Sequence, residues 1–480
     1  MTFSTATAAP RSRPFRVELT LTRKGDHVTL DGTASDEQAR GPVNYTTNLG
    51  LMRIHLARYL QMLDPDLEVN EGLLQNLDEW VVREGSIIKP RFPAPVGMRA
   101  NTMFRVLSCV FGTLAQSNDG QVPAASPVYV LYYFRAWDDA HRRPILCIEG
   151  LGVGLGARPF ADGVDVIYYI GQENYPVEYV EREFRLRVER YAVRPDSGGP
   201  GLHRGGTGVV RDVRVMCERA ELATRMENTL VAPYGVAGGR AGRTGRVVLN
   251  PGTPAERVLP GQGDGIVLER GDLFRLETCG GGGWGDPLTR DPMRVREDVA
   301  RGFVTVRGAR EDYGVVLDPV TLAVDKSATD DERGRRAAPL ALIDRGPGFA
   351  EAEALWRAGA APRREAPTRE VVMRTGTFRG FEVTLHEPGI AVISFNRPER
   401  LNGTTAHVKR DLVETLLQAQ MDDAVRVVIF TGQGRAFCAG DDISGRPPEF
   451  AGASGLVPDI PPATPMRSAP TRGCARSPSH

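Results

Sequence analysis

The segment DDAH brings together residue types that often bind metal ions. Asp138, Asp139 and His141 place two carboxylates and one imidazole within four residues. The segment follows an apolar run and precedes Arg142 and Arg143, an arrangement more typical of a solvated turn. We therefore expect a turn here and treat a metal site as the less favoured alternative.

Two glycine-flanked segments carry further polar side chains. His203 lies in GLHRGGTG, where a surface histidine is the simpler interpretation. Arg240 and Arg243 lie in GRAGRTGR, a basic loop that could contact a phosphate or a carboxylate, although a solvated hairpin is commoner. Neither segment by itself predicts a reaction.

Glycine-rich strings could in principle bind phosphate through backbone N–H groups. In GLGVGLG (150–156) the glycines occupy every second position and Leu155 stands where a dinucleotide fingerprint needs glycine, so a glycine-rich strand or turn is favoured. CGGGGWGDP (279–287) could expose N–H groups to an anion, but GxxxxGK[ST] occurs nowhere in the chain. We expect ATP hydrolysis to be the task of another polypeptide.

The overall composition indicates a protein that works on small molecules or other proteins. Lys and Arg number 60 and Asp and Glu also 60, so no excess charge favours nucleic acid or an anionic membrane. The six cysteines show no CxxC pair and suggest reduced thiols within a cell. The first residues, MTFSTATAAPRSRPF, lack the apolar core of a secretory signal, and no apolar run approaches ~20 residues. We expect a cytoplasmic location, with no nucleic-acid or membrane partner.

The pattern of apolar residues predicts a strand-rich first domain over residues 1–325. Helical spacing of apolar residues over 48–63, with Pro65 after it, predicts one helix. Strands are expected from Pro127, from Val164 and from Arg182, and over 207–216, 245–250 and 272–278, with glycine-rich turns between them. The expected class is α+β.

A change of composition divides the rest of the chain. Residues 326–376 mix charge, Ala and Pro and predict a linker. Residues 377–445 predict two strands, FEVTLHE and GIAVISFN, then a helix and the strand VRVVIFTG, a partial α/β unit of ββαβ order. Residues 446–480 are rich in Pro, Ser and Arg and predict a disordered tail.

Eight strings in order resemble the hydantoinase B/5-oxoprolinase family. They are DGTASDEQARGPVNYTTN (31–48), LDPDLEVNEG (63–72), EGSIIKPRFPAPVG (84–97), VPAAS (122–126), RPFADGVD (158–165), RVERYAVRPDSGGPGLHRGGTGVVRDV (187–213), ETCGGGGWGDP (277–287) and EDYGVVLD (311–318). The resemblance implies ATP-coupled chemistry on a cyclic amide or a ketone, with a hydantoinase A-type partner that binds the nucleotide.

This resemblance is to the C-terminal half of such a subunit. In the family a longer N-terminal region, which carries the metal-binding Asp/His cluster, precedes the first string, so this chain is expected to bind no metal itself. The segment VIYYIGQENYPVE (166–178) keeps Asn174 and Glu178 but lacks the histidine usual there. The resemblance therefore names no catalytic residue in this domain, and ATP and a divalent metal are expected elsewhere in a complex.

The C-terminal unit resembles the start of an enoyl-CoA hydratase/isomerase (crotonase) domain. The resemblance rests on SFNRPERLNG (394–403) and DDAVRVVIFTGQGRAFCAGDDI (422–443). It implies that Asn402 and Gly403 border a CoA thioester, and that the loop containing Gly440 and Asp441 supplies a backbone N–H to its oxyanion. Asp441 stands where the family usually has a small residue. The later glycine-rich turn and the acid/base glutamates are not in this sequence, so we expect no crotonase turnover.

Three functional interpretations follow. The preferred one is a partial hydantoinase B-type subunit of a cyclic amide hydrolase or a ketone carboxylase, inactive alone. The second is a non-catalytic product of the fusion of two reading frames. The third is an acyl-CoA-binding module that uses the two crotonase-like loops.

Overall fold

A computed structural model describes residues 2–7, 14–128, 130–138, 143–168, 173–336, 340–358, 373–422 and 424–440. The chain divides into two compact units, Met1–Arg363 and Arg364–His480. The expected tail over 446–480, together with Asp441, lies outside the described residues. Among the described helices, none combines the length and the apolar character needed to cross a lipid bilayer.

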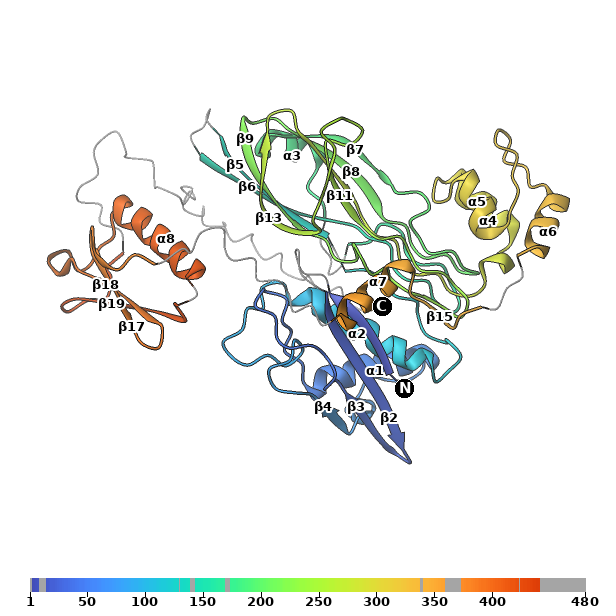
Figure 1. The fold of residues 1–480 in the computed structure, drawn as a ribbon, viewed down its shortest axis with the longest axis horizontal. Helices are drawn as coiled ribbons and strands as arrows, with labels where there is room; N and C mark the ends of the chain where they lie inside the picture. Colours follow the sequence, from blue (N-terminus) through green and yellow to red (C-terminus); the bar gives the residue numbers. More distant parts are fainter. Residues whose placement is uncertain are drawn as a thin grey trace, which may run out of the picture. The chain divides into compact units, whose positions relative to one another are not determined.

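The first unit begins with a four-stranded sheet packed against two helices (Figure 1). Its strands, in the order β1-β2-β3-β4, are β1 (Thr2–Thr7), β2 (Phe15–Lys24), β3 (His27–Asp31) and β4 (Glu79–Val81). The predicted helix is confirmed as α1 (Leu49–Leu63), and the Asn48 side chain caps it by accepting a hydrogen bond from Leu51 N. The second helix, α2 (Arg99–Ala115), packs on β1 and β2 and was not predicted.

Two further sheets enclose a second apolar core of the first unit. One has the order β12-β11-β14-β8-β7 and the other β13-β9-β5-β6. Their strands are β5 (Val130–Asp138), β6 (Arg143–Leu151), β7 (Leu186–Val193), β8 (Val209–Val215), β9 (Arg219–Arg225), β11 (Arg246–Leu249), β12 (Arg257–Leu259), β13 (Gln262–Glu269) and β14 (Leu273–Glu277). Inward-facing side chains of both sheets meet, as in the edge-on ring contact of Tyr132 with Phe274. A short helix, α3 (Val177–Phe184), precedes β7.

Glycine-rich segments from four regions of the chain pack backbone against backbone below these sheets. They lie near residues 152–163, 197–208, 235–245 and 279–285 and are joined laterally by main-chain hydrogen bonds, for example Gly206 N to Leu155 O and Gly281 N to Gly206 O. The expected strand from Val164 is wrong. Its described residues join this glycine-rich packing, with Leu155 N donating to Val164 O, and form only an isolated bridge at Ile167.

The predicted linker over 326–376 is wrong for its first part. Residues 326–336 and 340–358 contain α6 (Lys326–Gly334), β15 (Ile343–Asp344) and α7 (Pro347–Arg357). These elements pack on the first unit: β15 pairs with β10 (Gly235–Val236), and Trp356 Nε1 donates to Pro14 O at 2.7 Å. Single buried residues such as Ala352, which is fully buried, attach this segment to the first unit. The segment therefore needs no sustained apolar stripe in its sequence. The first unit therefore continues beyond the predicted boundary at 325.

Three short helical elements precede this segment and form a small subdomain with α6 (Figure 1). They are η3 (Pro287–Thr289), α4 (Pro292–Ala300) and α5 (Val306–Tyr313). Asp291 and Thr305 cap α4 and α5 by accepting hydrogen bonds from Met293 N and Gly308 N.

The second unit contains the predicted ββαβ order, preceded by one further short strand that was not predicted. Its sheet is β16 (Gly376–Phe378), β17 (Phe381–His386), β18 (Ile390–Phe395) and β19 (Val427–Gly432), paired in that order. β17 and β18 are antiparallel, and α8 (Ala406–Met421) connects β18 to the parallel strand β19. One face of the sheet and α8 share a core that includes Phe381, Ile393 and Val408. Taken separately, the two units give a mixed helix and strand fold with several sheets.

Candidate functional site

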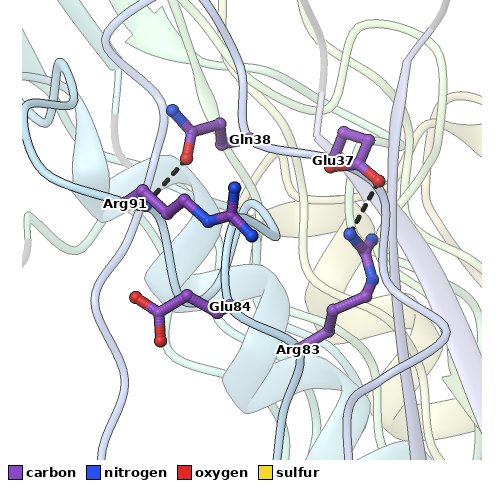
Figure 2. Close-up of a pocket in the computed structure, with 6 residues that line it drawn as sticks. Glu37, Gln38, Arg83, Glu84 and Arg91 are labelled. Carbon is purple, nitrogen blue, oxygen red and sulfur yellow. Dashed lines mark hydrogen bonds and ion pairs between the residues drawn. The ribbon is translucent and has the colours of Figure 1, made fainter.

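A polar cavity of about 390 Å³ opens in the N-terminal part of the first unit (Figure 2). Its lining residues come from two of the eight family-like strings: Glu37 and Gln38 from the first, and Arg83, Glu84, Gly85 and Arg91 from the third or its immediate flank. Their side chains are carboxylates, an amide and guanidinium groups. Such a lining suits a small charged ligand.

Main-chain contacts hold the two strings together around the cavity. Gln38 N donates to Gly85 O at 2.8 Å, and Glu37 forms an isolated antiparallel bridge with Ser86. Gly85 has a φ of +81° and its N–H donates to Lys89 O, which closes a tight turn that favours glycine. Arg91 N donates to Gln38 Oε1 at 2.7 Å and so fixes the amide at the cavity wall.

The charged groups of the cavity are unequally paired. Arg83 Nη1 lies 2.6 Å from Glu37 Oε1, and Arg83 Nη2 donates to Ser35 O at 3.0 Å. Among the described residues, the Glu84 carboxylate has Lys89 as its sole ion-pair partner, at 3.9 Å. Within the described part of the chain, the Arg91 guanidinium has no carboxylate or carbonyl partner. Figure 2 shows this guanidinium directed between Gln38 and the Glu37–Arg83 pair. The cavity can therefore bind charge, but its lining offers no nucleophile with an adjacent base.

A buried ionic network joins two other family-like strings, 158–165 and 187–213, to Arg290 and to Asp298 on α4. Arg290, which is 1% exposed, donates to both carboxylate oxygens of Asp162 at 2.7 Å and to Asp298 Oδ2 at 2.8 Å. Arg204 forms a similar bidentate pair with Asp165. Burial alone would raise the pKa of Asp162, but the hydrogen bonds and charge of Arg290 lower it. This network fixes the glycine-rich segments to α4 and has the character of a structural support.

A second buried pair lies between the two larger sheets. Arg211 Nη1 on β8 is 2.8 Å from Glu149 Oε1 on β6, and neither side chain is appreciably exposed. Asn174 donates to Glu149 Oε1 at 3.2 Å and accepts from Tyr191 Oη at 2.7 Å. Asn174, which the family resemblance singled out, therefore supports a buried carboxylate.

The buried thiols have no features of reactive cysteines. Burial, followed by the nearby Glu149 carboxylate, raises the pKa of Cys147 to about 12. Burial likewise raises the pKa of Cys279 to about 11. A thiol with a raised pKa is a poor nucleophile at neutral pH. The five cysteines in the described part of the chain are free, and Cys474 lies outside it.

Three interpretations of polar side chains differ, wholly or in part, from the structure. Asp138 is 3% exposed and bonds to Arg185 Nη2 at 2.9 Å, whereas a solvated turn was expected; Asp139 and His141 lie outside the described residues. His203 is half-buried against Trp284, and burial lowers its pKa. Arg240 and Arg243 belong to a glycine-rich segment and not to a hairpin. For Asp138 and His203, burial by segments distant in sequence made the difference, whereas Arg240 and Arg243 remain exposed.

The two crotonase-like loops lie side by side in the second unit. Thr404 N donates to Gly440 O at 2.9 Å, and Ala439 N donates to Leu401 O. The structure thus brings Asn402, Gly403 and Gly440 together. Asn402, however, is 1% exposed, and its amide donates to Gln433 O and Ala436 O and accepts from Arg397 N. Its side chain therefore holds the loops, and both N–H bonds of its amide are already used within the protein.

The divalent metal implied by the family resemblance was expected elsewhere in a complex. Across the described ranges, no three His, Cys, Asp or Glu side chains are grouped so that they could hold a metal ion. The residues that line the cavity of Figure 2 were not singled out as site residues from the sequence. The available signal was the presence of charged residues inside two strings whose order resembled one family.

Comparisons with known proteins extend these observations. A family model for hydantoinase B/oxoprolinase matches residues 2–287, and one for enoyl-CoA hydratase/isomerase matches residues 386–452. The chain is 25% identical over 396 residues to the acetophenone carboxylase delta subunit of Aromatoleum aromaticum, covering 72% of this chain and 57% of that protein. It spans about half the length of the curated relatives it matches.

Two solved structures share the fold of the first unit. Nucleotide-free acetone carboxylase, from work on ATP-dependent acetone carboxylation, superposes with a TM-score of 0.56 at 18% identity, covering 71% of this chain and 54% of that one. The ATP-dependent caprolactamase from Pseudomonas jessenii gives a TM-score of 0.56 at 22% identity, with 70% and 60% covered. At these identities the likeness concerns the fold alone.

Proposed function

The chain belongs to the hydantoinase B/oxoprolinase family, and from that premise we propose that it is the B-type component of a multi-subunit, ATP-dependent enzyme. Its substrate would be a cyclic amide that is hydrolysed or a ketone that is carboxylated. We further propose that the chain alone does not turn over substrate. The nucleotide would be bound by a hydantoinase A-type partner, and a catalytic divalent metal would be supplied outside the described residues.

The observation that carries this proposal is the match of the family model over 2–287, supported by the fold shared with two enzymes of ATP-dependent chemistry. The local structure is consistent with a supporting role. The family-like strings build a glycine-packed core and a charged cavity, and neither supplies a nucleophile with a base. Chemistry would then require groups that another component brings to this surface.

Reconstitution tests the proposal. The full chain is mixed with a hydantoinase A-type subunit and ATP, and ADP release is followed with 5-oxoproline, a hydantoin, caprolactam and acetone as separate substrates. We expect release that depends on both proteins and on one substrate class. Release no greater than that of the partner alone, with every substrate, would reject the proposal, and turnover by this chain alone would reject its inactivity.

A second candidate function is acyl-CoA binding by the second unit. The favouring observation is the direct contact of the loops at 401–404 and 438–440 together with the family match over 386–452. An observation against this function is that both N–H bonds of the Asn402 amide are used in internal hydrogen bonds. Titration of the full chain with a short acyl-CoA in a calorimeter tests the idea, and heat equal to dilution would leave the second unit as a non-catalytic fusion partner.

A further inference from the structure

The cavity of Figure 2 contains one cationic group without a partner. The Arg83 guanidinium forms an ion pair with Glu37 and donates a hydrogen bond to Ser35 O, so its charge is already neutralised. Arg91 contributes only its backbone N–H to the protein contacts of the cavity, and its exposed guanidinium pairs with none of the described carboxylates. A guanidinium in this state presents a planar fork of donors that matches a carboxylate.

The same cavity also contains one anionic group with little compensation. Glu84 is 59% exposed, and its distance to Lys89 Nζ is 3.9 Å, at the limit of an ion pair between two mobile side chains. Exposed pairs of this kind contribute little, so the Glu84 carboxylate remains able to accept a ligand cation. The unmatched charges of the cavity are therefore one positive and one negative.

We propose that this cavity binds an amino-carboxylate zwitterion, with the ligand carboxylate on Arg91 and the ligand ammonium on Glu84. A volume of about 390 Å³ accommodates a small molecule of this class. Gln38, whose amide oxygen is held by Arg91 N, limits the cavity beside the carboxylate position.

The inference rests on the proposed function and narrows it. Hydrolysis of a lactam adds water across the amide: the C–N bond breaks, the water oxygen joins the carbonyl carbon to give a carboxylate, and both water protons end on the nitrogen, which becomes an ammonium on the same molecule. Carboxylation of a ketone yields a carboxylate without an ammonium, and opening of a hydantoin yields an N-carbamoyl group that carries no charge. Two unmatched charges of opposite sign therefore favour the ring-opened product of a lactam.

A ligand-observed NMR titration of the full chain tests this without ATP or partner. The probes are 6-aminohexanoate and glutamate as zwitterions, and hexanoate and hexylamine as analogues with one charge. We expect a Kd on the order of 1 mM for at least one zwitterion and roughly tenfold weaker binding of each single-charge analogue. Equal binding of hexanoate and 6-aminohexanoate, or no binding of any probe, would overturn the proposal.

Substitutions locate the site. Arg91→Gln should weaken zwitterion binding about tenfold, and Glu84→Gln should remove the preference for 6-aminohexanoate over hexanoate. Arg40→Gln and Glu71→Gln change exposed charges that do not line the cavity and should leave both values unchanged. If zwitterion binding is unchanged in Arg91→Gln and in Glu84→Gln, the ligand binds elsewhere and the assignment of this cavity is rejected. ADP release by the reconstituted enzyme is a separate measurement, so the two proposals can fail independently. If the zwitterion does not bind but the reconstituted enzyme still turns over, only the assignment of the cavity is rejected. If the zwitterion binds but the reconstituted enzyme does not turn over, only the proposed function is rejected.

Discussion

Arg290 connects three regions of the first unit through its guanidinium. It pairs with Asp162 before the glycine-rich segment at 197–208, with Asp298 on α4, and with Leu202 O at 2.9 Å. A buried guanidinium is tolerated only when its donors are matched, and here two carboxylates and a carbonyl match them. The residue holds the helical subdomain against the glycine-rich packing.

Replacing Arg290 with Met should destabilise the first unit by about 3 kcal/mol, because the partly buried Asp162 and Asp298 lose the guanidinium that hydrogen-bonds to both of them. Urea unfolding followed by tryptophan fluorescence measures the change. Arg294→Met removes an exposed arginine of the neighbouring helix α4 and should alter the free energy of unfolding by no more than about 0.5 kcal/mol. Similar values for the two variants would contradict a supporting role for the Arg290 network.

At the scale of single residues, the sequence was most informative where a family pattern named a position. The family pattern named Asn402, Gly403 and Gly440 as residues beside a CoA thioester, and the structure brings the two loops that carry them into contact, while CoA binding itself stays a prediction. The role of the Asn402 side chain was not predictable, because its partners Gln433 O and Ala436 O are main-chain groups about thirty residues away. Arg290 and Arg91 were missed for a similar reason: their chemistry depends on which distant groups do or do not face them.

The pairing of β7 with β8 shows how one side chain stabilises an element. The register places Arg187 directly opposite Arg214, a like-charge pair that would weaken the sheet. Glu189, next to the register shift at Val188 and Arg190, accepts hydrogen bonds from Arg187 Nη2 at 2.7 Å and from Arg214 Nη2 at 2.8 Å. The hydrogen bonds from Arg214 and Arg187 lower the pKa of Glu189 to about 2.

Glu189→Gln should therefore reduce stability at neutral pH by up to about 1 kcal/mol, and less at high salt. A depressed carboxyl pKa contributes stability above the ordinary glutamate value of about 4.3 and loses it as the pH falls toward 2. The difference in urea midpoint between wild type and variant should accordingly shrink over that window. Glu71→Gln, at an exposed glutamate, serves as the control, and a pH-independent difference for Glu189→Gln would refute the explanation.

At the scale of elements, a helix or strand could be predicted where its sequence shows distinct apolar and polar faces. The helix at 48–63 was found because a polar cap, helical spacing and a following proline coincide. The 17-residue helix α2 was missed because eleven of its residues, including Arg105, Ser108 and Thr113, are buried. A helix enclosed on most sides shows no polar face in its sequence. In the second unit alternating and helical patterns are clear, and the ββαβ order was predicted.

At the scale of the whole first unit, its centre depends on contacts that leave no side-chain signal. Glycine-rich segments that are distant in sequence approach so closely that the contacts are between backbones, and their hydrogen bonds do not form an ordinary sheet. From the local sequence alone, these segments were therefore predicted to be turns between strands. Only the family resemblance indicated that the strings belong to one structure, and it gave no information on how they pack.

Gly281 provides a direct test of this packing. A Cβ at this position would lie 2.0 Å from Leu155 O and 2.1 Å from Leu155 C, so an alanine requires two main-chain segments to separate. Gly281→Ala should cost roughly 3 kcal/mol or more. At Gly334, the last residue of α6, a Cβ would meet nothing within 4 Å, and Gly334→Ala should change stability by less than about 1 kcal/mol. Thermal unfolding of the first unit compares the two, and because the second unit has a separate core, its own transition should be unaffected by either change. A Gly281→Ala protein as stable as wild type would show that the glycine-rich segments do not pack in close contact.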